Sequence, residues 1–394
     1  MAQGFTTNGS SGASGSAGGD LSGTYPNPTV AKINTVTLGT VVNTSRKILV
    51  GNGTNIVSST ETWATPGTSG KILISDGTNW ITSTPTYPST AGTSGNVLTS
   101  DGTNWTSAAP ANPVNKSLCQ GRLTLTTATP VTTSDVTAAT SVFFTPCAGD
   151  QISLYDGSSA WTTLTFTELT ISVPATTSTM YDVFIYNNAG TAAARAAVAW
   201  TNDTTRATAL VLQNGVLVKS GATTDRYVGS FRTTGSSGQT EDSLAKRYVW
   251  NYYNRVNRPM KVVDTTDTWN YSTASYQQAR ATSSNQLDFI IGYREDSVEA
   301  TVLGSCVNST ATGRFVAVGI GLDSTSTNSA QIQNSTTVTS ALRNVCHAVY
   351  KDSIAVGRHT LVWLELGAGS DTQTWAGDAG VTGLQTGITG TVRG

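Results

Sequence analysis

Charged side chains are scarce in this chain, because they make up 12% of its 394 residues, against a usual share of about 25%. The 24 acidic and 23 basic residues nearly cancel, and they form neither a basic block nor an acidic tail. A protein that neutralises nucleic-acid phosphates needs a concentrated basic surface. The composition therefore indicates no nucleic-acid partner.

Long apolar runs are missing as well. No stretch of ~18 apolar residues could span a bilayer, and the first four residues, MAQG, lack the basic and apolar regions of a signal peptide. We therefore expect no membrane insertion and no export.

Cysteine is rare and irregularly spaced. Cys119, Cys147, Cys306 and Cys346 are separated by 28, 159 and 40 positions, which matches no zinc or redox pattern. We interpret them as free thiols. Two disulfides, one within each successive pair, are the alternative. No metal site and no cofactor are expected.

Catalytic groups are also few. His347 adjoins Cys346, but neighbours in a strand point to opposite faces, so the two would not form a nucleophilic pair. His359 lies in a predicted strand, where a structural role is expected. The acidic pairs at 241–242 and 295–296 resemble the two carboxylates of a glycosidase, although adjacent acids are commonly solvated loops. The sequence predicts a protein that is not an enzyme, with a polysaccharide depolymerase as the alternative.

What the sequence does contain is a repeat. The six residues SDGTNW occupy positions 75–80 and recur at 100–105, and a looser copy, ILVGNGTNI, occupies 48–56. Each copy has an Asp-Gly or Asn-Gly step between a short apolar run and a Thr/Ser-rich one, which is typical of a β-hairpin turn. We expect a shaft of β-hairpins over residues 41–114.

A unit of about 25 residues cannot bury an apolar face by itself, so stacking or other chains must cover it. We expect Ile72, Ile74, Trp80, Leu98 and Trp105 to pack within the repeat or between chains. Three chains around one axis would leave no open sheet edges. The sequence thus predicts a homotrimer. Sugar stacking on exposed Trp rings is the alternative role of the repeated tryptophans.

The residues before the repeat are unusual in composition. Positions 4–19 are almost wholly Gly, Ser, Ala, Thr and Asn, which cannot sustain a core, so their order must come from a partner. The following residues 19–30, GDLSGTYPNPTV, contain two prolines that favour extended backbone. This motif, followed by hairpin repeats, resembles the start of bacteriophage fibre proteins. The resemblance implies that residues 1–40 anchor the chain to a phage tail or capsid protein.

Beyond residue 114, short alternating runs separated by Pro, Gly and Asn predict an all-β fold. We expect a β-sandwich domain at 115–258 and a jelly-roll-like domain at 259–394, divided at Arg258-Pro259. The alanine-rich run 191–200 is interpreted as strand, and the acidic stretch 240–245 as one helical turn. The expected strands are 123–126, 141–144, 151–155, 163–166, 169–173, 181–186, 260–263, 286–291, 297–302, 315–320 and 359–365.

The most aromatic segment is KRYVWNYYNR at 246–255. Its residues Tyr248, Trp250 and Tyr252 fall on one face of a strand, which predicts packing against a neighbouring sheet or domain. Base stacking or glycan binding would use the same rings.

Residues 122–394 resemble a region of tailed-phage and prophage structural proteins, through AWTNDTTRA at 199–207 and WNYYNRV at 250–256. Residues 357–365, GRHTLVWLE, resemble a late strand of the trimeric tumour-necrosis-factor-like jelly roll. These resemblances imply a virion fibre that assembles in the host cytoplasm and works by adhesion. A tail fibre that attaches to the host surface is favoured, and a head fibre or decoration protein is the alternative.

In such a fibre the C-terminal loops would lie farthest from the virion and would carry any contact with a host cell-surface glycan. The candidate contact residues occupy two polar stretches, one predicted loop at 323–328 and another at 371–375. An exposed Trp375 would suit a sugar ring, whereas burial in the trimer seam is its alternative. The candidates are Asp323, Thr325, Asn328, Asp371, Gln373 and Trp375.

Overall fold

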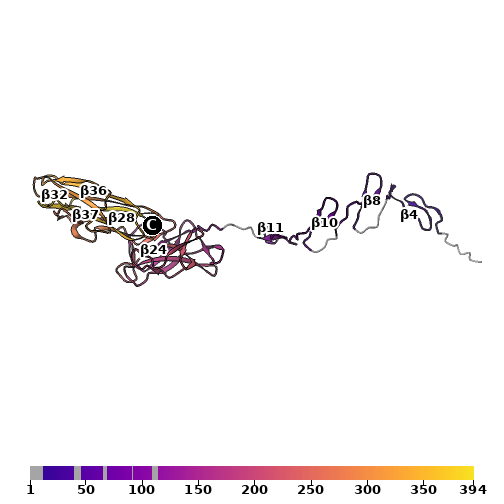
Figure 1. The fold of residues 1–394 in the computed structure, drawn as a ribbon, viewed down its shortest axis with the longest axis horizontal. Helices are drawn as coiled ribbons and strands as arrows, with labels where there is room; N and C mark the ends of the chain where they lie inside the picture. Colours follow the sequence, from indigo (N-terminus) through magenta and orange to yellow (C-terminus); the bar gives the residue numbers. More distant parts are fainter. Residues whose placement is uncertain (1–11, 40–45, 65–68, 91, 109–113) are drawn as a thin grey trace, which may run out of the picture. The chain divides into compact units, whose positions relative to one another are not determined.

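The computed structural model describes residues 12–39, 46–64, 69–90, 92–108 and 114–394. The chain divides into two compact units, an N-terminal unit (Met1–Pro113) and a C-terminal unit (Val114–Gly394). Both are built from β-strands (Figure 1), and within the described ranges the one helical element is the short 3₁₀ turn η1 (Ala279–Ala281). The prediction of an all-β fold is confirmed.

The N-terminal unit consists of short antiparallel strand pairs, several of which Figure 1 labels. The first three pairs fall within residues 15–37, and the last three fall on the three copies of the sequence repeat. The pairs are β1 (Gly15–Ser16) with β3 (Thr24–Tyr25), β2 (Leu21–Ser22) with β4 (Thr29–Val30), β5 (Lys32–Ile33) with β6 (Val36–Thr37), β7 (Leu49–Gly51) with β8 (Ile56–Ser58), β9 (Leu73–Ser75) with β10 (Trp80–Thr82), and β11 (Val97–Ser100) with β12 (Trp105–Ala108).

The C-terminal unit begins with three sheets that share one core. Two of them are small, and the third has seven strands centred on the long strands β19 and β24. The small sheets are β13 (Gly121–Thr124), β15 (Ser141–Pro146) and β18 (Leu169–Ser172), and β16 (Gln151–Tyr155) with β17 (Trp161–Thr165). The seven strands are β19 (Met180–Asn188), β20 (Thr191–Ala194), β21 (Val198–Ala199), β22 (Leu210–Gln213), β23 (Val216–Lys219), β24 (Ala222–Arg232) and β27 (Val249–Asn251).

Two further sheets complete the unit, one of eight strands and one of seven. The eight are β14 (Val136–Ala139), β25 (Thr240–Asp242), β26 (Lys246–Arg247), β31 (Gln286–Ile291), β37 (Gly357–Leu366), β33 (Arg314–Leu322), β35 (Ser335–Val338) and β30 (Tyr276–Gln278). The seven are β28 (Asn257–Val263), β39 (Gly387–Arg393), β32 (Val298–Asn308), β36 (Asn344–Asp352), β34 (Ile332–Gln333), β29 (Thr268–Asn270) and β38 (Gln373–Ala376).

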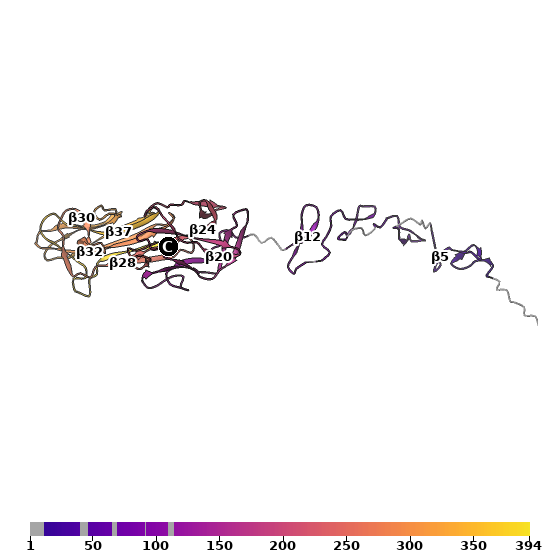
Figure 2. The same ribbon diagram turned by 90° about the horizontal axis from the view of Figure 1, so that it is seen from below.

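These two sheets enclose the largest apolar cluster. It combines side chains of β31, β33 and β37 from one sheet with side chains of β32, β36 and β39 from the other, including the fully buried Trp363 and Trp375. Figure 2 shows β37 of the first sheet beside β32 and β28 of the second. Alternating residues of each strand supply this cluster, as expected for sheets that bury one face.

The predicted domain boundary at 258–259 falls inside a strand. Pro259 belongs to β28, and the eight-stranded sheet joins strands from both sides of the boundary, so Val114–Gly394 forms one compact unit. The proline fits because β28 is the first strand in its sheet, and an edge strand tolerates a residue without an N–H donor. Just before the boundary, the buried carboxylate of Asp242 binds both Arg247, at 2.9 Å, and Arg258, at 2.6 Å. Arg247 also donates across the boundary to the carbonyl of Pro259 at 2.6 Å.

Two local interpretations come out differently. The run at 191–200 forms β20 and β21, so its interpretation as strand is confirmed. The helical turn expected at 240–245 is wrong, because residues 240–242 form β25, which pairs with β14 and β26. Its acidic side chains bind Lys246 and the two arginines named above instead of the free N–H groups of a helix start.

The aromatic segment packs as expected. Tyr248 and Trp250 are buried, and Tyr252 is partly buried against the same apolar cluster. The packing prediction for this segment is confirmed. All four cysteines are free thiols, and three of them are buried.

Candidate functional site

The copies of the repeat close with the same turn chemistry. The side chain of Asp76 accepts hydrogen bonds from the amides of Thr78, at 2.8 Å, and Asn79, at 2.7 Å. Asp101 does the same at the same distances in the next copy, and the amide oxygen of Asn52 takes this role in the first. An Asp or Asn side chain that binds the amides two and three residues ahead fixes a tight turn.

Each of the last two strand pairs is also tied to the segment that precedes it. Asn79 Oδ1 accepts hydrogen bonds from both the amide and the hydroxyl of Thr62, each at 2.9 Å. Asn104 accepts the equivalent bonds from Thr86, 18 positions earlier, at 2.8 and 2.7 Å. The residues that recur in the repeat therefore make two kinds of contact. The Asp fixes the turn, and the Asn links the strand pair to the segment before it.

The tryptophans of the repeat stack on aromatic residues of the preceding segment. Trp80 stacks on Trp63 with ring centroids 5.5 Å apart, and Trp105 stacks on Tyr87 at 6.3 Å. One face of each ring is thus covered within the chain. Trp80 and Trp105 are still 40% and 37% exposed as residues, so part of their surface has no cover from this chain.

The apolar residues of the N-terminal unit are exposed in the single chain. The five predicted packing residues, Ile72, Ile74, Trp80, Leu98 and Trp105, are between 37% and 51% exposed. Among the described residues of this unit, only Ser59 and Ser83 are buried. A large exposed apolar surface on a soluble protein normally marks an interaction site.

The motif at 19–30 folds onto the residues that follow it. The carboxylate of Asp20 accepts hydrogen bonds from the amides of Asn34 and Thr35, both at 2.9 Å. Both of these residues have positive φ, at 47° and 68°. The acid of the motif therefore holds a sharp local turn, in addition to the extended backbone that its prolines predict.

The first predicted contact loop lies after β33. Thr325 is exposed, while the side chain of Asn328 accepts backbone hydrogen bonds from Ile320 and Ala330, both at 3.0 Å. Asp323 binds the ring of His359 at 2.8 Å and the amide of Thr360 at 2.7 Å. Burial alone would raise the pKa of Asp323, but these hydrogen bonds outweigh it and lower that pKa. Asp323 and Asn328 thus hold the loop, and Thr325 is exposed to solvent together with Ser326 and Thr327.

The second predicted loop, 371–375, is largely a buried strand. Gln373 and Trp375 are both fully buried in β38, which pairs with β29 and β32. The indole of Trp375 donates to the carbonyl of Tyr271 at 3.0 Å and lies in the core of its own chain. The expectation of an exposed Trp375, and equally of one in a trimer seam, is therefore corrected, because its side chain faces the core between the two sheets of its own chain.

Asp371 lies just before β38, and its side chain is held by hydrogen bonds. Its carboxylate accepts hydrogen bonds from Arg314 at 2.7 Å and Thr310 at 2.8 Å. Hydrogen bonds from Arg314, Thr310 and Asn308 lower the pKa of Asp371 to about 2. A carboxylate this well satisfied is a structural support and has little capacity left for a ligand.

The candidate catalytic groups are dispersed. Glu295 and Asp296 both bind Arg255, and His359 binds Asp323, so these groups form structural pairs. His347 is exposed and Cys346 is buried on the opposite face of β36, as the strand argument predicted. In the described ranges, no three His, Cys, Asp or Glu side chains gather into a group that could hold a metal ion.

One buried acid has a strongly perturbed pKa. Glu365 is fully buried in β37, and burial raises the pKa of its carboxyl to about 7. Its oxygens accept hydrogen bonds from the indole of Trp269 at 2.7 Å, the amide of Gln277 at 2.9 Å and the backbone of Arg280 at 3.0 Å. The buried carboxylate of Asp264 raises the pKa of Glu365 further. Asp264 is itself held by Arg280 and Asn285, each at 2.8 Å, so we interpret the two acids as parts of one structural network and not as the pair of a glycosidase.

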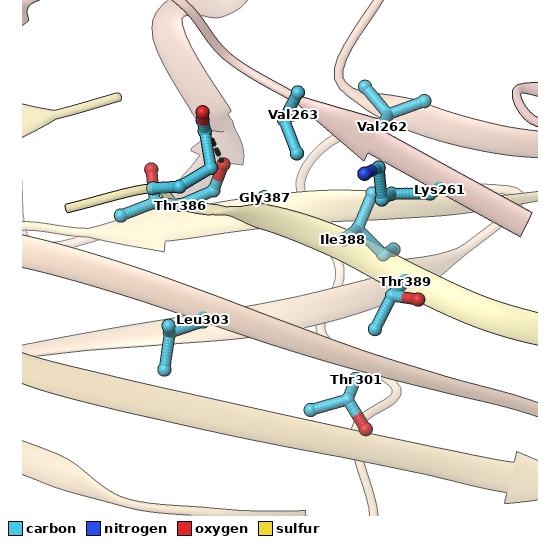
Figure 3. A pocket seen from close by; sticks show the side chains of 10 residues that line it. Lys261, Val262, Val263, Thr301, Leu303, Thr386, Gly387, Ile388 and Thr389 are labelled. Atoms are coloured by element: carbon cyan, nitrogen blue, oxygen red, sulfur yellow. Dashed lines mark hydrogen bonds between the residues drawn. The ribbon is translucent and has the colours of Figure 1, made fainter. Parts of the chain in front are cut away.

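Two hollows of the C-terminal unit differ in the chemistry of their lining residues. The first, of about 200 Å³, lies on the open face of the seven-stranded sheet that contains β28, β39 and β32. Figure 3 shows Lys261, Thr389 and Leu303 on these three strands around it. Lys261 is its one titratable lining residue, so this hollow suits apolar contact and not acid–base chemistry.

The second hollow is a cleft of about 480 Å³ between the loop before β22 and the loop after β31. Its polar lining includes Thr204, Arg206 and Arg294, and its aromatic lining is Tyr293. The sequence did not single out this site. The loops lie about 90 positions apart in the chain, and only the fold brings them together.

Comparison with known proteins adds no family: no family model matches the chain, and no curated protein matches it. In the part of the chain that the structure describes, no helix is long and apolar enough to span a membrane.

Proposed function

We propose that this chain is the subunit of a bacteriophage virion fibre, most plainly a tail fibre that attaches the particle to its host. The observation that carries the proposal is the N-terminal unit, which repeats one turn and one link along the chain while leaving its apolar side chains exposed. A repetitive element joined to one compact β-unit is suited to display, because repeats can be added without changing the unit that makes the contact.

The exposed apolar side chains support assembly with other copies of the chain. Fully burying one such side chain stabilises by about 1.5–3 kcal/mol, so covering a half-exposed one contributes about 1 kcal/mol. The same five residues on three parallel chains would meet around one axis, and a closed ring of strand pairs leaves no sheet edge for further association. We therefore take the fibre to be a parallel homotrimer, with jelly-roll-like packing in its outer part.

Two truncations test this function together. Deleting residues 1–40 should leave a soluble oligomer that no longer enters phage particles, because the anchor is lost. The matched control deletes residues 75–99, one period of the repeat, which joins Ile74 directly to the second SDGTNW. That variant should still enter particles and carry a shorter shaft.

Labelling with an antibody against residues 114–394 would locate the incorporated protein on the tail or on the capsid. The same antibody should block adsorption to the host. Normal incorporation of the protein without residues 1–40, or unimpaired adsorption when the antibody covers the outer unit, would contradict the proposed function.

A further inference from the structure

The cleft between the loops before β22 and after β31 has an apolar floor and a polar rim. Leu210, Tyr293 and Val356 line it and also pack against the apolar cluster that contains Trp200 and Trp250. The ring of Tyr293 is fixed further by an edge contact with Tyr252, at a centroid distance of 5.6 Å. The cleft volume of about 480 Å³ lies within the roughly 300–1,000 Å³ range of small-molecule sites.

The two loops are held in place by hydrogen bonds that need no ligand. Arg206 donates to the carbonyl of Gly292, which joins the first loop to the second. The carbonyl of Asp203 accepts the amide of Arg358 at 2.8 Å, and the side chain of Asn202 accepts the amide of Thr204 at 2.9 Å. The cleft is therefore formed before any ligand arrives, which reduces the ordering cost of binding.

The rim of the cleft is cationic. Arg206 lines it, stacked over Trp200 at 4.3 Å, with its charge balanced by the buried Asp182 at 2.7 Å. Among the described residues, Nη1 of Arg206 makes no hydrogen bond. Arg294 is exposed and binds only the hydroxyl and carbonyl of Ser353, at 3.3 and 3.2 Å. The lining contains two arginines and no carboxylate.

We infer that this cleft binds a saccharide that carries a carboxylate. The apolar face of a sugar ring would stack on Tyr293, and Arg294 would bind the carboxylate. The hydroxyls of Thr204 and Thr205 would bind the sugar hydroxyls, that of Thr204 as an acceptor because it already donates to Asn202 at 3.1 Å. A phenol ring, paired hydroxyls and an uncompensated arginine in one preformed cleft match each part of that ligand. The inference deepens the proposed function, on which it rests, by naming the chemistry of the host surface that the fibre contacts.

The test uses the purified full chain and saturation-transfer NMR. The probes are glucuronic acid and galacturonic acid, with glucose and galactose as their neutral counterparts. At least one acid should bind with a dissociation constant on the order of 1–10 mM, as expected for a monosaccharide, and its neutral counterpart should bind at least tenfold more weakly.

Two variants localise the binding. Arg294→Met should weaken the acidic sugar about tenfold and leave the fold intact, because the side chain is exposed, and Arg294→Lys should restore part of the affinity. Arg343→Met, at an exposed arginine outside the cleft, is the control and should bind as the wild type does.

The inference is overturned if none of the acids binds, if neutral and acidic sugars bind equally, or if Arg294→Met binds as tightly as Arg343→Met. A chain that is trimeric and enters particles but fails these tests would retain the proposed function and lose only this site. A chain that stays monomeric but binds the acid would retain this site and lose the proposed function.

Discussion

Replacing Arg226 by methionine should loosen the junction at which the C-terminal unit begins. Arg226 is 1% exposed in β24, and its guanidinium donates to the carbonyls of Lys116 at 3.0 Å, Leu118 at 2.8 Å and Ser153 at 2.6 Å, all from Nη1. Nη2 donates to the carbonyl of Ser117 at 2.9 Å. One side chain thus gathers three successive carbonyls of the segment that follows Pro113.

The magnitude follows from which of these oxygens keep a partner. The carbonyl of Leu118 also accepts the amide of Ser153 at 2.9 Å, whereas those of Lys116 and Ser117 have no second partner among the described residues. Lys116 and Ser117 are exposed, so water can replace the guanidinium there, whereas the bond to the Ser153 carbonyl is buried. A hydrogen bond to a charged group contributes about 1.5–3 kcal/mol. Methionine retains part of the contact with the ring of Tyr253, over which the guanidinium lies at 4.6 Å. The Nε of Arg226 is buried without a hydrogen-bond partner in the described part of the chain. Removing it relieves an unfavourable burial and offsets part of the lost stability. We expect a net destabilisation of about 2–4 kcal/mol.

Thermal unfolding of the full chain measures this change. For a unit of this size, about 2–4 kcal/mol corresponds to a fall in the melting midpoint of roughly 5–12 °C. Hydrogen exchange of a peptide covering residues 114–121 should also accelerate, because the clamp on that segment is gone. The matched control is Arg393→Met, whose side chain is 51% exposed and whose partner Asp296 keeps a second ion pair with Arg255.

Exposed ion pairs contribute on the order of 0–1 kcal/mol, so the melting midpoint of Arg393→Met should be close to that of the wild type. Equal midpoints for the two variants, or unchanged exchange at 114–121 in Arg226→Met, would refute the reasoning that Arg226 holds the junction.

Three further predictions concern the interior of the C-terminal unit. Burial raises the pKa of Glu365 from 4.5 to about 7, so the stability that the protonated Glu365 contributes is complete below pH ~4.5 and is lost as the pH rises through 7, by up to about 3 kcal/mol. Melting scans from pH 5 to 8 should show the midpoint fall. Glu365→Gln should remove this pH dependence. Trp375→Ala should lower the free energy of unfolding by about 3–5 kcal/mol, as measured by denaturant unfolding. The same substitution in an exposed binding loop would hardly change that free energy. A maleimide should modify the half-buried Cys147 well before the other three cysteines, which are buried, and mass spectrometry of the timed reaction would contradict this if all four reacted together.

Periodicity predicted many of the strands because it follows directly from which face is buried. The expected strands 151–155 and 286–291 coincide with β16 and β31, and 359–365 falls within β37. The strand pair β22–β23 was missed although its Asn214-Gly215 step carries the same turn signal as the repeat. Local signals of this kind can be read from neighbouring residues alone.

The long strand β24 was missed for a different reason. It buries Asp225, Arg226 and Arg232, and charged residues in a run normally predict solvent exposure. Their partners, including the carbonyls of residues 116–118 and the carboxylate of Asp203, lie far away in the sequence. The burial of Trp375 and the cleft around Tyr293 likewise depend on strands and loops that only the complete fold brings together.

The central claim is that the exposed apolar side chains of the N-terminal unit are covered by two other copies of the same chain. Native mass spectrometry of the full chain at micromolar concentration tests it most directly. The account predicts a complex of three chains, and predicts that replacing Ile72, Ile74 and Leu98 by serine shifts the population toward single chains. A stable monomer at that concentration would contradict the account.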